Sequence, residues 1–138
     1  MNRRLIAILA LAAIGVAVSS YLLTVHWGWW QALCFLEGSK CEAVNFSPWS
    51  ELLGIPVAFL GALTYLAIIA SALLIARKKY ADNARVALFF ISAIGVAFSA
   101  YLTSIEAFVL HQYCEWCVLS AILITLIAVL SALELRQD

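Results

Sequence analysis

Four long apolar runs constrain the fold of this 138-residue chain more than any other feature. They cover roughly residues 5–25, 55–76, 86–110 and 114–135. Each matches the ~20 residues that an α-helix needs to cross ~30 Å of hydrocarbon. Hydrophobic residues make up 66% of the chain and charged residues 12%, far outside the range of soluble domains. We therefore predict an all-α membrane protein, a four-helix transmembrane bundle formed by a single domain over residues 1–138.

The first run shares some features with a secretory signal. Arg3 and Arg4 precede it, and residues 17–19 loosely resemble a cleavage site. Its apolar stretch is longer than the core of about 7–15 residues found in such signals. Because the four-span topology also needs this run, we expect it to form the first span.

Basic residues predict the orientation in the membrane. All but Lys40 fall at chain ends or connections that share one side: Arg3, Arg4, Arg77, Lys78, Lys79, Arg85 and Arg136. The positive-inside rule places that side in the cytoplasm, with both termini. The loop over residues 26–54 and the short connection before the last span then lie outside. The net charge is zero, and no basic stripe indicates a nucleic acid as partner.

All four cysteines fall on the predicted outer side, which in bacteria is the oxidising compartment. Cys34 and Cys41 lie in the long loop, whereas Cys114 and Cys117 form a Cys-x-x-Cys pair where the last span begins. Backbone N–H groups and the helix dipole stabilise a thiolate at such a helix N-terminus. Redox chemistry is the favoured reading; a zinc site that includes His111, and inert buried or disulfide-bonded cysteines, are the alternatives.

Two segments, 14–22 and 94–102, are nearly identical in sequence. In each copy a glycine precedes a serine by four residues, the spacing that allows helix backbones to approach closely in lipid. An ancestral duplication and two similar packing faces both explain the pattern. In either case we expect the first and third spans to be close-packed neighbours.

The outer loop contains signals for a short helix and for an aromatic site. Ser47 and Pro48 read as an N-cap followed by the proline favoured at the first helical position, so a short interfacial helix is predicted over 48–53. All five tryptophans, Trp49 among them, fall at the outer interface. They form either a headgroup-level belt or the wall of a site for a flat, apolar ligand.

The order of these parts resembles the bacterial branch of the vitamin K epoxide reductase family. The resemblance runs from residue 14 to about 121 and rests on the following residues: Cys34 and Cys41, 44–49, 53–56, Tyr101 and Leu102 with Glu106, and 113–118. The other four-span thiol oxidase family, that of disulfide-bond protein B, carries its two cysteine pairs in the reverse order.

The resemblance implies a quinone-dependent thiol oxidoreductase in the bacterial cytoplasmic membrane. A thioredoxin-like periplasmic partner would reduce the Cys34–Cys41 disulfide, Cys41 would attack Cys114, and Cys117 would reduce ubiquinone or menaquinone. Ser47 would help to bind the quinone, with Trp49 as a further candidate for its site. Apart from the resemblance, Glu106 and His111 near the outer end of the third span are candidates for a proton route to the reduced quinone, with an ordinary interfacial role as the alternative. Net flow towards the quinone would generate extracytoplasmic disulfides.

Two departures from the family pattern narrow this expectation. Ala121 stands where vertebrate relatives carry a tyrosine, and the second span lacks their asparagine. Epoxide reduction is therefore the secondary alternative among enzymes, and a non-catalytic scaffold with structural or zinc-binding cysteines is the alternative outside them. Many bacterial relatives have a fused thioredoxin-like domain, which these residues do not encode, so we expect a separate partner protein.

Overall fold

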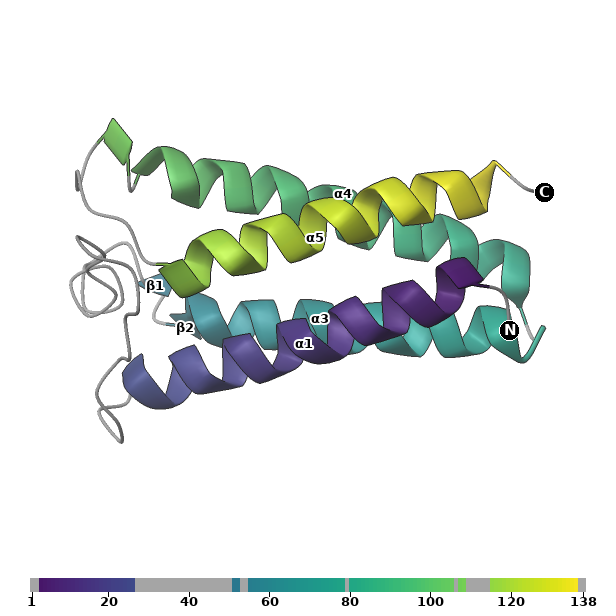
Figure 1. The fold of residues 1–138 in the computed structure, drawn as a ribbon, viewed down its shortest axis with the longest axis horizontal. Helices are drawn as coiled ribbons and strands as arrows, with labels where there is room; N and C mark the ends of the chain where they lie inside the picture. Colours follow the sequence, from purple (N-terminus) through teal and green to yellow (C-terminus); the bar gives the residue numbers. More distant parts are fainter. Residues whose placement is uncertain are drawn as a thin grey trace.

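Four long helices make up most of the computed structural model, which describes residues 3–26, 51–52, 55–78, 80–105, 107–108 and 115–136. The helices are α1 (Arg3–His26), α3 (Val57–Ala76), α4 (Ala81–Ile105) and α5 (Glu115–Leu135). Two short antiparallel strands, β1 (Glu51–Leu52) and β2 (Ile55–Pro56), precede α3. Figure 1 shows the helices side by side, with both termini at one end of the bundle.

Each helix contains a stretch long and apolar enough to span a membrane. Large apolar side chains also face outwards from all four helices; exposed examples are Ile14, Leu66, Phe90, Ile94 and Val129. A helix that is apolar on every side suits a lipid environment, where the backbone polar groups bond within the helix itself. The four spans confirm the predicted all-α bundle and a multi-pass membrane protein.

The helices are arranged as a ring in which each contacts two others. Among the described residues, α1 packs along α3 and α5, and α4 packs along the same two helices. The pairs α1 with α4 and α3 with α5 therefore face each other across the centre. Fully buried aliphatic side chains fill the middle of the bundle: Ile8, Ile68, Ile124 and Ile127.

The prediction that the first and third spans are close-packed neighbours is wrong. These spans are α1 and α4, which lie across the ring from each other. Their small residues instead receive side chains from other helices. A Cβ atom at Gly15 would overlap the Tyr65 ring of α3, and one at Gly95 would lie 2.8 Å from Cγ1 of Ile124 in α5. The repeated glycines thus allow close packing, but on different partners.

Two predicted boundaries also need correction. The third span was expected from residue 86, whereas α4 begins at Ala81. Its polar first turn contains Asp82, whose carboxylate suits a helix N-terminus but lies outside the apolar run.

In the predicted interfacial helix over 48–53, Glu51 and Leu52 form β1 instead, because they pair with Pro56 and Ile55. The remaining positions of that predicted helix lie outside the described residues.

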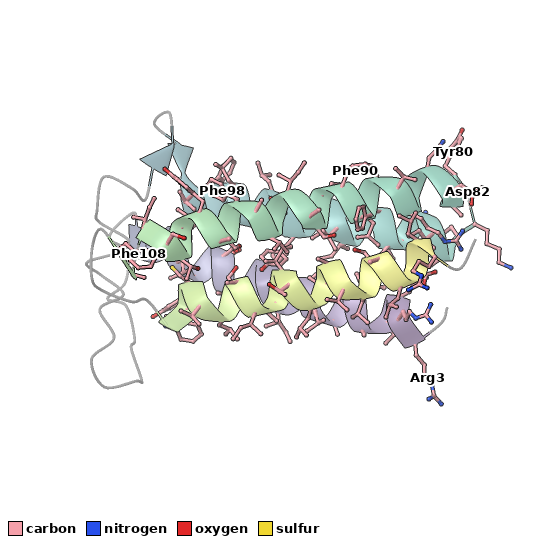
Figure 2. The ribbon with its side chains drawn as sticks, turned by 90° about the horizontal axis from the view of Figure 1, so that it is seen from above. Arg3, Tyr80, Asp82, Phe90, Phe98 and Phe108 are labelled. Atoms are coloured by element: carbon pink, nitrogen blue, oxygen red, sulfur yellow. The ribbon has the colours of Figure 1, made fainter. Side chains whose placement is uncertain are left out.

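A buried carboxylate joins three helices at the end of the bundle that holds the termini. The Glu134 side chain of α5 is 2% exposed. Its oxygens lie 3.9 Å from Nη1 of Arg4 in α1 and 3.6 Å from Nε of Arg85 in α4. Asp82 pairs with Arg85 at 3.3 Å, but its side chain is 85% exposed. Figure 2 shows Arg3 and Asp82 at this end and Phe108 at the other.

We predict that Glu134→Gln destabilises the bundle far more than Asp82→Asn. Removal of the buried charge leaves two guanidinium groups without their shared carboxylate, at a cost of about 3 kcal/mol, the lower part of the range for a broken buried pair. The exposed pair contributes at most about 0.5 kcal/mol. Free energies of unfolding in mixed micelles measure both effects. Equal losses in the two variants would contradict this account of the buried charge.

Candidate functional site

Cys117 lies in the first turn of α5. Figure 1 shows that α5 begins at the end of the bundle away from the termini. Cys117 is the predicted site residue that falls within the described part of the chain. The others lie outside the described residues, and their roles stay predictions: Cys34, Cys41, Ser47, Trp49, Glu106, His111 and Cys114. The structure thus places one of the four predicted redox sulfurs.

The position of Cys117 suits thiolate chemistry. Helix α5 is described from Glu115, so Cys117 is its third residue. The first backbone N–H groups of a helix have no acceptor within that helix, and the helix dipole is positive there. A thiolate at this place is stabilised relative to one in the middle of a span. The sequence prediction that the Cys-x-x-Cys pair opens the last span is therefore confirmed for Cys117.

The side chain of Cys117 packs into an apolar wall. It is half-buried against Val18 and Leu22 of α1, both of which are buried. Ala58 of α3 and Leu119 of α5 pack on the same cluster. A half-buried thiol beside aliphatic side chains can react with a lipid-soluble oxidant more readily than with a charged one, since a charged molecule loses hydration on approach.

An aromatic pair lies beside this wall. Tyr21 of α1 and Trp116 of α5 have ring centroids 5.3 Å apart and are tilted by 54°. Both rings pack against the same Val18 and Leu22 cluster as Cys117. Trp116 therefore does more than contribute to an interfacial belt, because its ring also covers the apolar cluster next to the sulfur. This contact agrees with an aromatic wall beside the thiol.

Two hydroxyl groups deeper in the bundle were not singled out by sequence. Tyr65 of α3 hydrogen bonds to the carbonyl oxygen of Ser120 at 2.8 Å and to its Oγ at 2.9 Å. Ser120 follows Cys117 by three residues, so both lie on the same side of α5. The spacing of three residues could therefore have identified Ser120 from the sequence as a neighbour of Cys117. Nothing in the sequence pairs Tyr65 with Ser120, because the two residues come from helices that face each other across the bundle.

We predict that the preference for a small uncharged maleimide over a charged methanethiosulfonate reagent is greater at reduced Cys117 than at an exposed cysteine. The apolar neighbours of the thiol admit the first and oppose the second. The measurement uses a variant with Cys34, Cys41 and Cys114 replaced by serine, in detergent. The control places a cysteine at an exposed site by Asp82→Cys in a background that lacks all four native cysteines. Equal reagent preference at both positions would contradict the described burial of Cys117.

A comparison with known protein families identifies the family of this chain. Residues 6–132 match the Vitamin K epoxide reductase family, so the match covers the described helices almost completely. This is a family of oxidoreductases that link thiols to quinones. The four membrane-spanning helices and a cysteine in the first turn of the last one agree with that chemistry. The chain therefore belongs to the Vitamin K epoxide reductase family.

Proposed function

We propose that the protein is a thiol oxidase that transfers electrons from a separate thioredoxin-like protein to a membrane quinone. The observation that carries the proposal is the place of Cys117. Its thiol lies in the first turn of a membrane-spanning helix, half-buried against apolar side chains. Membership of an oxidoreductase family supports the same chemistry.

The proposed electron route uses two cysteine pairs in turn. The dithiol of the partner reduces the Cys34–Cys41 disulfide and leaves as a disulfide. The Cys41 thiolate then attacks Cys114 in the Cys114–Cys117 disulfide, which releases the Cys117 thiolate. Cys34 attacks Cys41 in the mixed disulfide, so the first disulfide reforms and Cys114 and Cys117 are both reduced. Two electrons have then moved from the first cysteine pair to the second.

The final acceptor in this proposal is a quinone, which takes up two electrons and two protons when the last dithiol returns to a disulfide. The wall beside Cys117 fits such a flat, apolar molecule, because Val18, Leu22, Tyr21 and Trp116 present aliphatic and aromatic surface there. Ubiquinone and menaquinone both satisfy this requirement. Ser47 and Trp49 are the proposed binding residues, with Glu106 and His111 as proposed proton donors.

The proposed orientation follows from the charged end of the bundle. Arg3, Arg77, Lys78 and Arg136 are exposed, and they lie at helix ends on the side of the termini. Cys117 lies at the opposite end of α5. With the basic end in the cytoplasm, the redox chemistry takes place at the outer face. We propose the cytoplasmic membrane of a bacterium as the location, and disulfides in secreted proteins as the final product.

The first test measures quinone reduction by purified protein with a reduced thioredoxin-like partner. We predict that Cys114→Ser and Cys117→Ser lower the rate to the background without protein, because each removes a sulfur of the last dithiol. Ser104→Ala is the matched control, since its exposed hydroxyl bonds within α4 to the Ala100 carbonyl oxygen. Ubiquinone, menaquinone and an epoxide are supplied separately, and product analysis distinguishes quinone reduction from epoxide reduction.

Two results would contradict the proposed function. One is a folded wild-type protein that reduces no quinone with any partner. The other is full activity in the two cysteine variants, which would favour a scaffold with structural cysteines. Circular dichroism of every variant shows whether the helices are intact.

The second test addresses the proposed order of thiol exchange. We predict that Cys34→Ser accumulates a mixed disulfide between Cys41 and Cys114, because the thiol that resolves this intermediate is missing. Mass spectrometry of peptides after alkylation identifies the linked pair. Cys34→Ser combined with Cys41→Ser is the control, in which this species cannot form. A stable link from Cys41 to Cys117 instead would reverse the assigned roles of the last two cysteines.

A further inference from the structure

A buried hydroxyl pair joins α3 to α5 one helical turn below Cys117. Tyr65 is 2% exposed and lies at the centre of the bundle. Its hydroxyl group lies 2.8 Å from the carbonyl oxygen of Ser120 and 2.9 Å from Oγ of the same residue. Since the carbonyl oxygen can only accept, the Tyr65 hydroxyl donates to it. The Ser120 hydroxyl then donates to Tyr65, so both groups are satisfied.

This pair bridges two helices that do not pack along each other. Helices α3 and α5 face each other across the ring of four, and α1 and α4 lie between them. Tyr65 therefore reaches across the bundle with the full length of its side chain. Gly15 of α1 makes the path possible, because a Cβ atom there would overlap the Tyr65 ring. Three helices thus meet at this ring.

Among the described residues, the apolar cluster against which Cys117 packs comes from the same three helices. On α1, Val18 and Leu22 follow Gly15 by three and seven residues, so all three lie on one side of the helix. On α3, Ala58 precedes Tyr65 by seven residues and also contacts the Cys117 cluster. The junction at Tyr65 is therefore the next layer below the cysteine on each of these three helices.

We propose that Tyr65 is a positioning residue for Cys117. Its two hydrogen bonds fix the rotation and depth of the first turns of α5, and this places the sulfur against Val18 and Leu22. Helix ends fray more readily than their centres, and the backbones of α3 and α5 make few close approaches that could replace these bonds. This inference rests on the proposed function of Cys117, but the position of its thiol can be measured without turnover.

A matched control exists on the same helix. Ser131 of α5 and Ser92 of α4 form a hydrogen bond of 2.9 Å, and both side chains are buried. This pair also joins α5 to another helix through hydroxyl groups, but it lies eleven residues beyond Ser120, near the terminal end. Loss of either pair removes buried hydrogen bonding from α5. Of the two pairs, only the Tyr65 pair lies at the turn below Cys117.

The experiment compares Tyr65→Phe, Ser120→Ala and Ser131→Ala. Tyr65→Phe keeps the ring and removes both bonds, whereas Ser120→Ala keeps the bond to the carbonyl oxygen. We expect Tyr65→Phe to lower kcat for quinone reduction about tenfold to a hundredfold, the range for small misplacement of a reacting group. Ser120→Ala should have a smaller effect and Ser131→Ala none. KM for the soluble partner should not change, because that protein meets the outer cysteine pair.

A second readout does not depend on quinone. The rate of maleimide reaction with Cys117, in the variant that keeps this cysteine and has serine at the other three positions, should rise in Tyr65→Phe and stay constant in Ser131→Ala. The midpoint potential of the Cys114–Cys117 pair, measured in the full enzyme, should shift in Tyr65→Phe alone. If Tyr65→Phe does not fold, Ser120→Ala is compared with Ser131→Ala instead. It keeps the tyrosine and removes only the bond between the two hydroxyl groups.

Equal behaviour of Tyr65→Phe and Ser131→Ala in kcat, labelling rate and potential would overturn the inference and leave Tyr65 with a purely structural role. Inactivity of the wild-type enzyme with every quinone would instead refute the proposed function. The labelling rates would still show whether Tyr65 positions the thiol, so the two failures are distinguishable.

Discussion

Hydrocarbon offers no hydrogen bonds, and this constraint governs where polar groups occur in the bundle. Exposed hydroxyl groups, such as those of Ser104 and Thr125, bond to carbonyl oxygens of their own helices. Buried polar side chains find partners on other helices: Glu134 with Arg4 and Arg85, Ser92 with Ser131, and Tyr65 with Ser120. Because lipid is as apolar as leucine, apolar burial alone does not select one helix arrangement over another. Close packing at Gly15 and Gly95 and the internal polar contacts select this one.

Helix α5 depends on these contacts at both ends. Glu134 holds its last turn to α1 and α4, and Tyr65 holds its second turn to α3. Ser131 adds a contact near the charged end. The helix that carries Cys117 in its first turn is therefore held to each of the other three described helices. The partly buried position of Cys117 is a result of this arrangement as much as of its own contacts with Val18 and Leu22.

The sequence predicted the spans well because length and apolarity are properties of each segment alone. It also placed Cys117 correctly, since a Cys-x-x-Cys pair at the start of an apolar run is a local pattern. It did not predict which helices are neighbours. The glycines at 15 and 95 signal close approach, but they do not identify Tyr65 or Ile124 as the residues that approach. Likewise, Glu51 and Leu52 lie in a strand because of pairing with Ile55 and Pro56, which capping signals do not encode.

The aliphatic layer formed by Ile8, Ile68, Ile124 and Ile127 lies between the Tyr65 pair and the serine pair, and its side chains are almost completely buried. Chains of hydroxyl groups or water conduct protons, whereas packed isoleucines do not. Under the proposed function, protons released by the thiols and protons taken up by the acceptor are then exchanged at the same end of the bundle. Such a reaction is electrically neutral across the bilayer, so its rate is insensitive to the membrane potential.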